Sequence, residues 1–152
     1  MKVRIEIGEQ NEDEIVIRCR QFTDEIQHLQ RMLQESRHPT ELSLTLGESE
    51  YFVPIQSLLF FETDGAGRLA AHTAKQMFYT DLSLRSLEQL LPRTFMRVSK
   101  SCILNSAQVS SMTRSVTGSG TVHFAGSEKI AYVSRMYYKA LGALIYETRL
   151  SK

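Results

Sequence analysis

Alternating apolar and polar positions predict short β-strands at the start of the chain. Residues 2–7 alternate strictly, and residues 15–20 form a second apolar run after an acidic loop. Apolar residues then recur at helical spacing after Thr23, a plausible N-cap, which predicts a helix over residues 23–36. We therefore expect residues 1–39 to form a small β-β-α unit. Such a unit is too small to be stable alone and should pack on its neighbour or on a second copy.

Residues 40–152 have a different, β-rich pattern. Residues 41–46 and 50–54 predict a hairpin around Gly47, and three further strands over 57–63, 68–73 and 75–80 should be antiparallel neighbours. A short helix is expected between Ser83, a candidate N-cap, and Pro92. Apolar segments at 95–98, 99–105, 109–113 and 129–133 follow, with hairpin tips at 117–120 and 125–128. Ser134 should cap a closing helix.

Composition describes an ordinary globular protein. With 152 residues, 42% hydrophobic and 23% charged, the chain suits one domain plus a short appendage. The longest apolar-leaning run, residues 51–61, is well short of the roughly 20 residues that span a bilayer. Glu6 and Glu9 fall where a signal peptide needs apolar residues, so we expect no secretory leader and a cytoplasmic protein.

The cysteines and histidines suggest no chemistry of their own. Cys19 and Cys102 lie in separate apolar surroundings without metal-ligand spacing, and we expect both to be buried small hydrophobes. His72 and His123 are expected to be strand residues beside the sheet. The sequence contains no nucleophile elbow, phosphate loop or paired-carboxylate strand end. We therefore predict that the protein is not an enzyme and uses no cofactor or metal.

Charge is distributed unevenly along the chain. Residues 1–65 contain 6 Lys and Arg against 13 Asp and Glu, a net charge of −7, whereas residues 66–152 contain 12 against 4, a net charge of +8. Clustered Lys and Arg gain free energy by releasing the counterions condensed on phosphates, so a basic half favours a polyanion-binding face. Solvated helix surfaces would give the same count, and the asymmetry alone leaves both interpretations open.

The segment Phe95 to Asn105 carries the most specific pattern. Its sequence, FMRVSKSCILN, resembles the Phe-Phe-Arg-x-His-Arg-Ser-x-x-Val-Asn signature of the LytTR family of bacterial DNA-binding domains. Supporting pieces occur in family order: residues 55–62, a glycine-containing turn before Arg68, the short helix after Ser83, and the Ser-Arg pair at 134–135. The resemblance runs from about residue 41 to residue 144. Each piece alone is weak, but the ordered combination is specific.

The resemblance implies a fold and a function. It implies a mostly β fold, α+β overall, of antiparallel sheets with short helices, which binds direct repeats in promoter DNA through loops rather than a recognition helix. Most relatives follow a phospho-acceptor receiver domain, which the roughly 40 preceding residues are too few to form. The N-terminal unit resembles instead the extension of stand-alone LytTR regulators. We expect a sequence-specific transcription regulator that aspartyl phosphorylation of this chain does not control.

The resemblance also places DNA contacts in four parts of the chain. The residues carried over are Gly67, Arg68, Ser83, Ser99, Lys100 and Arg135. Arg135 suits a guanine edge or a phosphate, and Lys100 suits a phosphate. Arg68 and Ser83 have structural roles that are equally plausible, such as helix capping by Ser83. The family often has His at Ser99, a polar side chain at Gly67 and a longer amide at Ser83, so base preferences of relatives do not transfer.

Partners and alternatives follow from the same reasoning. We expect a homodimer, joined through the N-terminal unit, because linking two domains raises the affinity for two repeats.

Stand-alone relatives are often encoded beside a small membrane protein, which is a candidate regulator. The alternative is a protein-interaction module that uses exposed β edges. Single-stranded RNA binding would need exposed aromatics on a basic sheet, but Phe60, Phe61 and Phe95 are predicted to be buried.

Overall fold

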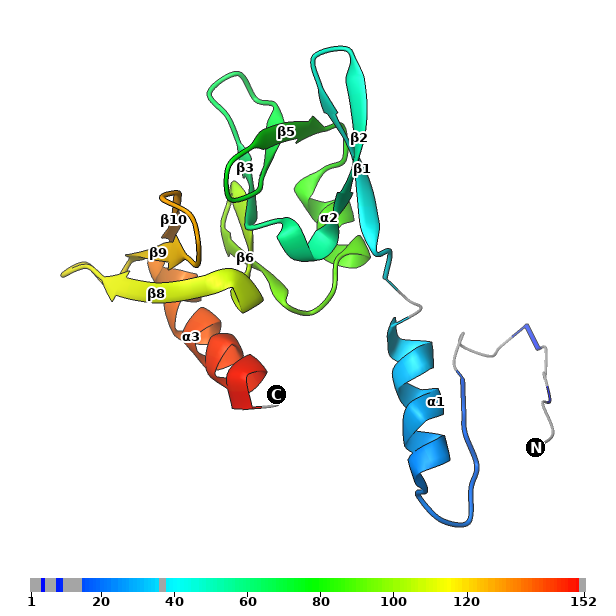
Figure 1. Ribbon diagram of the computed structural model, residues 1–152. Coiled ribbons are helices and arrows are strands. Elements are labelled where there is room, and N and C mark those ends of the chain that lie inside the picture. Colours follow the sequence, from blue (N-terminus) through cyan, green and yellow to red (C-terminus); the bar gives the residue numbers. More distant parts are fainter. Residues whose placement is uncertain (1–3, 5–7, 10–14, 36–37, 151–152) are drawn as a thin grey trace. The chain divides into compact units, whose positions relative to one another are not determined.

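The computed structural model describes residues 4, 8–9, 15–35 and 38–150 and divides into two compact units, Met1–Glu35 and Ser36–Lys152 (Figure 1). In the first unit, helix α1 spans Asp24–Glu35, which confirms the predicted helix. The backbone amide of Ile26 donates to Oγ1 of Thr23 at 3.3 Å, so Thr23 caps this helix as expected. None of residues 4, 8–9 and 15–33 is buried, and Met32 on the apolar face of α1 is 53% exposed.

The predicted strand over residues 15–20 is wrong. These residues have no regular secondary structure, and Ile15 is 73% exposed. A strand needs a neighbouring strand for its backbone hydrogen bonds, and a single two-stranded hairpin is marginal in water. The predicted strand over residues 2–7 lies, except for Arg4, outside the described residues. The burial predicted for Cys19 is also wrong, because no sheet is present there to cover it.

The second unit contains two antiparallel sheets. The larger has the strand order β2-β1-β5-β4-β3-β7-β6, and the smaller has the order β10-β9-β8. The strands of the larger sheet are β1 (Glu41–Leu46), β2 (Ser49–Pro54), β3 (Phe60–Thr63), β4 (Leu69–His72), β5 (Met77–Thr80), β6 (Phe95–Ser99) and β7 (Cys102–Asn105). Those of the smaller sheet are β8 (Val109–Arg114), β9 (Gly120–Phe124) and β10 (Ile130–Val133). This architecture confirms the mostly β, α+β fold predicted from the sequence.

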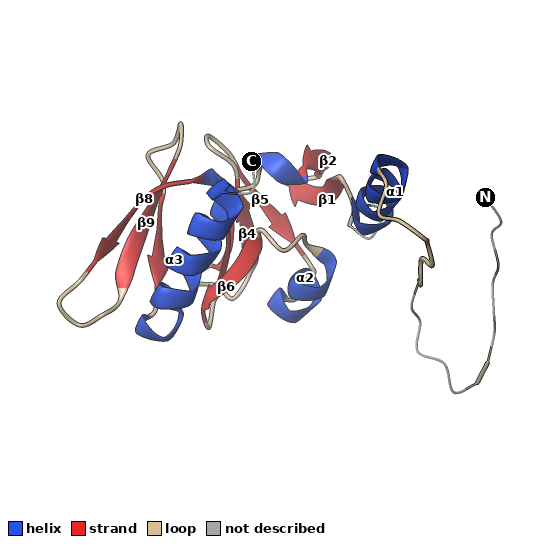
Figure 2. Ribbon diagram, turned by 90° about the horizontal axis from the view of Figure 1, so that it is seen from below, coloured by secondary structure: helices blue, strands red, loops and turns tan. Residues whose placement is uncertain are grey.

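Two α-helices and two short 3₁₀ turns complete this unit. The α-helices are α2 (Leu84–Leu90) and α3 (Arg135–Leu150), and the 3₁₀ turns are η1 (Ile55–Ser57) and η2 (Ser106–Gln108). Each α-helix is amphipathic and covers its own hydrophobic cluster. Leu87 of α2 packs with Phe61 and Ile103 of the larger sheet. Leu141 of α3 packs with residues from both sheets. In Figure 2, α3 lies in front of the strands. No helix in the described ranges is long and apolar enough to cross a bilayer.

The predicted core aromatics are mostly confirmed. Phe61 is fully buried and Phe60 nearly so, while Phe95 is partly buried against the cluster under α2. The alternation in β1 places Leu42 and Leu44 in the core and leaves the intervening residues exposed. The buried aromatics are therefore unavailable for base stacking.

A contact between His72 and Lys129 joins the larger sheet to the segment that leads into β10. Nζ of Lys129 lies 3.2 Å from Nδ1 of His72 on β4, and it donates to the carbonyl oxygen of Gln76 at 2.6 Å. The His72 ring stacks on Phe60 with 4.3 Å between the ring centroids. Burial, and then the positive charge of Lys129, lower the pKa of His72 to about 4. His72 is a neutral structural acceptor near pH 7, and no three metal-ligating side chains come together among the described residues.

Candidate nucleic-acid interface

The strand registers bring several loops to one end of the larger sheet. Thr63 at the end of β3 pairs with Leu69 at the start of β4, and Leu69 pairs with Thr80 at the end of β5. Cys102 at the start of β7 pairs with Glu62 of β3 and with Ser99 of β6. The β3–β4 turn, the β5–α2 connection and the β6–β7 turn therefore emerge on the same side. We call this surface the loop end, made of residues 64–68, 81–83, 99–101 and 134–135.

Arg97 shapes the β6–β7 turn. Its Nε donates to the carbonyl oxygen of Ser99 at 2.8 Å, and its second guanidinium nitrogen donates to that of Lys100 at 2.6 Å. The guanidinium also pairs with Glu88 of α2 at 3.0 Å. Oγ of Ser99 accepts from the amide of Ser101 at 3.2 Å. These bonds fix the turn backbone and leave Lys100 exposed.

A β-bulge connects this turn to the start of α3. The register of β6 and β7 shifts between Arg97 and Ser99, so Val98 has no partner in β7. Its carbonyl oxygen accepts instead from the amide of Ser134 at 2.8 Å. On the other side of the turn, the amide of Thr63 donates to the carbonyl oxygen of Ser101 at 3.0 Å. The β6–β7 turn therefore lies between the end of β3 and the first residues of α3.

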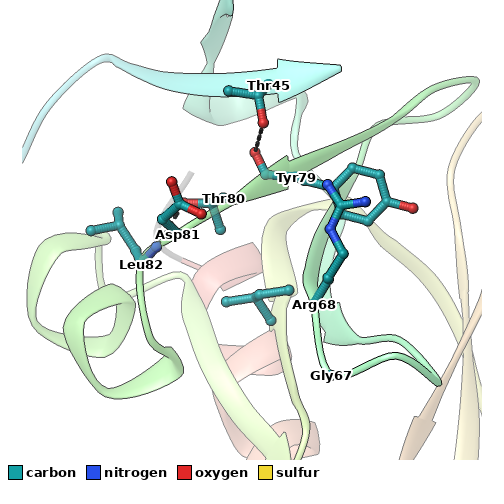
Figure 3. A pocket seen from close by; sticks show the side chains of 8 residues that line it. Thr45, Gly67, Arg68, Tyr79, Thr80, Asp81 and Leu82 are labelled. Carbon is teal, nitrogen blue, oxygen red and sulfur yellow. Dashed lines mark hydrogen bonds between the residues drawn. The ribbon is translucent and has the colours of Figure 1, made fainter. Parts of the chain in front are cut away.

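The β3–β4 turn presents Arg68 over an aromatic ring. Gly67 has a φ of 82°, a conformation that glycine adopts without strain, and Oδ1 of Asp64 accepts from the amide of Arg68 at 2.9 Å. The Arg68 guanidinium lies 3.7 Å from the centre of the Tyr79 ring (Figure 3). A cation–π contact of this kind holds a guanidinium in place while its charge stays accessible.

A shallow pocket beside Arg68 reaches the β5–α2 connection. Its volume is about 280 Å³, and its lining includes Gly67, Arg68, Tyr79, Asp81 and Leu82 (Figure 3). The next residue, Ser83, caps α2 as predicted, because its Oγ accepts from the amide of Ser86 at 3.0 Å. Ser83 thus lies at the loop end with its hydroxyl already engaged.

Arg135 is the exposed first residue of α3. The amides of Tyr137 and Tyr138 donate to the carbonyl oxygen of Ser134, so the helix begins where the sequence predicted. The Arg135 side chain lies directly against Gly118 in the β8–β9 turn. A Cβ atom at Gly118 would stand only 2.9 Å from Cγ of Arg135, and Gly118 has a φ of 93°. A glycine is therefore required where this arginine crosses the turn.

The comparison with family models decides the identity of the domain. The model described as the LytTr DNA-binding domain matches residues 48–145. The chain belongs to the LytTR family. Among solved structures, the chain is similar to the LytTr DNA-binding domain of a protein from Bacillus cereus that is described as a methyl-accepting/DNA response regulator. The two share 18% identity at a TM-score of 0.64, over 70% of this chain and 97% of that one. No curated protein matches the sequence.

The charges of this LytTR domain suit a polyanion. The sequence contains no Asp or Glu between Glu88 and Glu128, a stretch that includes Arg93, Arg97, Lys100 and Arg114. In the described part of the chain, neither Lys100 nor Arg135 forms a salt bridge. Of the acids at the loop end, Asp64 accepts hydrogen bonds within its own turn, and Asp81 lines the pocket.

The structure brings all six sequence-predicted site residues to the loop end: Gly67, Arg68, Ser83, Ser99, Lys100 and Arg135. Sequence reasoning missed the structural roles of Arg97 and Tyr79 and the position of the β8–β9 turn beside Arg135. The acid-free stretch of this LytTR domain was the available signal for that turn. No feature of the sequence predicted that Arg68 contacts Tyr79, because this contact depends on the register between β4 and β5.

Proposed function

We propose that this protein is a transcription regulator that recognises direct repeats in promoter DNA through its loop end. The observation that carries the proposal is the gathering of Arg68, Lys100 and Arg135, which lie far apart in the sequence, around one end of a LytTR domain. All three are exposed. We expect the protein to act in the cytoplasm, where bacterial promoters are found.

The three cations are proposed to have different roles. Arg135 is suited to read a guanine edge, because its planar guanidinium can donate two hydrogen bonds in the major groove. Lys100 is suited to a phosphate, because an ammonium group attracts charge without requiring a planar partner. Arg68, held by Tyr79, is preorganised for a phosphate or a base beside the pocket. Ser99 and Gly67 allow close approach of the turn backbones. Ser83 donates to a phosphate by turning its O–H away from Oγ of Ser86, while its oxygen still accepts from the amide that caps α2.

Footprinting and salt dependence together test this proposal. The purified protein should protect two short segments of the same orientation in DNA from upstream of its own gene, and the logarithm of its affinity should fall steeply with the logarithm of salt concentration. Protection of a single site, or of none, would contradict binding to direct repeats. Affinity that hardly changes with salt would contradict an interface that neutralises several phosphates.

We also propose that helix α1 joins two copies into a homodimer. Ile26 and Leu29 lie on its apolar face with Met32, and all three are exposed or partly exposed within their own unit. Two such faces can bury each other. In the full chain, Leu29→Asp should give a monomeric mass in light scattering, whereas Gln27→Asp, on the polar face, should leave the mass of the dimer unchanged. A monomeric mass for the unaltered chain would contradict this proposal.

A protein-interaction module is the second candidate, and the edge strand β2 is the observation in its favour. Phe52 on β2 is 68% exposed, and an exposed edge strand can pair with another chain. Such binding should respond little to salt, which separates it from DNA binding. The partner that we propose for pairing at β2 is a small membrane protein of the kind that is often encoded beside stand-alone LytTR regulators. Retention of the protein on vesicles that contain that partner would support it.

A further inference from the structure

The β8–β9 turn, residues 115–119, carries three hydroxyls in one cluster. Oγ of Ser115 lies 2.9 Å from Oγ1 of Thr117 and 2.9 Å from Oγ of Ser119, and the latter two are 3.2 Å apart. Ser115 and Thr117 are exposed and Ser119 is partly exposed. Three neighbouring hydroxyls offer several O–H donors that can turn toward an anion.

The registers place this turn next to the loop end. Arg114 pairs with Gly120 at the base of the turn, and Gly120 pairs with Val133 at the end of β10. Ser134 follows immediately, and its amide donates to the carbonyl oxygen of Val98 near the end of β6, beside the β6–β7 turn. The side chain of Arg135 lies against Gly118 within the turn. The hydroxyl cluster is therefore adjacent to the arginine proposed to read a base.

Charge and exposure favour an anionic partner for the turn. No Asp or Glu occurs between Glu88 and Glu128, and Arg114 stands at the base of the hairpin. Val116 at the tip is fully exposed and contributes nothing to the core. A polar, acid-free turn with one exposed apolar side chain matches the surface of a nucleic-acid backbone, which alternates phosphates with less polar sugars.

We propose that the β8–β9 turn is a separate anchor for the DNA backbone. Its hydroxyls donate to a phosphate next to the base contacted by Arg135, and Val116 packs on the adjoining sugar. The anchor fixes the position of α3 on the duplex but does not itself read sequence. This inference rests on the proposed DNA-binding function and adds to it a surface outside the loop end.

Charge reversal at Thr117 tests the anchor. In the full chain, Thr117→Asp should weaken DNA binding about fivefold or more. Thr117→Lys should strengthen DNA binding and make the logarithm of the affinity fall more steeply with the logarithm of salt concentration, by the amount expected for about one more phosphate contact. The same substitutions at Ser110, exposed on β8 but several residues along the strand from the turn, are the matched controls. Their effects should be smaller, because the separation exceeds the screening length of about 8 Å at physiological salt.

Two duplexes are titrated by fluorescence anisotropy. One comes from upstream of the protein's own gene, and the other is a scrambled version of it. A phosphate anchor should change both affinities by the same factor, so equal effects of Thr117→Asp on the two duplexes support it. Effects no larger than those at Ser110, with thermal unfolding confirming that the variants are folded, would overturn it. Val116→Asp, at a fully exposed site, replaces Thr117→Asp if that variant is unfolded. If the unaltered chain shows no preference for the upstream duplex, the proposed sequence-specific function is overturned instead. The effect of Thr117→Asp on the affinity for the scrambled duplex still tests the anchor in that case.

Discussion

Arg97 holds the β6–β7 turn in shape through two backbone carbonyls and Glu88. Lysine keeps the charge but lacks the planar set of donors that reaches both carbonyls. We predict that Arg97→Lys lowers the free energy of unfolding by about 1–2 kcal/mol and weakens DNA binding, because Lys100 is no longer fixed in place. Urea denaturation and anisotropy measure the two effects.

Arg93→Lys is the matched control for this prediction. Arg93 pairs with Glu147 on an exposed surface, and exposed ion pairs contribute little to stability. Stability and DNA affinity should both stay near the values of the unaltered chain. If Arg97→Lys behaves like Arg93→Lys, then the hydrogen bonds to the turn carbonyls do not determine its conformation.

At the scale of elements, two substitutions at Ser83 distinguish a role in helix capping from a role in DNA contact. Ser83→Ala removes the acceptor for the amide of Ser86 and should lower the free energy of unfolding by about 1 kcal/mol. Aspartate caps as well as serine, so Ser83→Asp should keep the stability but weaken DNA binding if phosphate lies nearby. Thermal unfolding and anisotropy on the same three proteins check this. Unchanged affinity in Ser83→Asp would restrict Ser83 to a capping role.

Local pattern predicted the elements that carry their own signals. The hairpin of β1 and β2 follows from alternation around Gly47, and α2 follows from its cap and the proline beyond its end. The strand predicted over residues 15–20 failed because apolar residues alone do not supply a pairing partner. The burial predicted for Cys19 failed for the same reason. Cys102 is buried because it begins β7, which pairs with β3 on one side and β6 on the other.

For the whole molecule, the burial of His72 beside Lys129 predicts a pH dependence of stability. The pKa of His72 is about 4 in the folded protein, below its ordinary value near 6.5. The unfolded chain therefore binds a proton first as pH falls, and the stability present above pH 6.5 should decline between pH 6.5 and about 4. His72→Gln should reduce this decline in thermal unfolding. An identical decline in His72→Gln would show that other groups cause it.

The order of strands in the larger sheet could not be predicted from the local pattern of apolar and polar residues. Phe61 of β3 pairs with Ile103 of β7, and three strands (β4, β5 and β6) and helix α2 lie between them in the sequence. Such pairing depends on the global packing of both clusters. The candidate site residues were therefore identifiable from the family signature, while their meeting at one end of the sheet required the structure.

The affinity ratio between upstream and scrambled DNA, measured for the unaltered chain and for Arg135→Ala, tests the central proposal most directly. The account predicts a clear preference for the upstream duplex that falls by about 1–3 kcal/mol in Arg135→Ala, the discrimination of one bidentate base contact. Lys100→Ala should weaken both affinities by similar factors, because a phosphate contact carries no sequence information. Equal binding of both duplexes by the unaltered chain, or a preference that survives intact in Arg135→Ala, would contradict base reading at the start of α3.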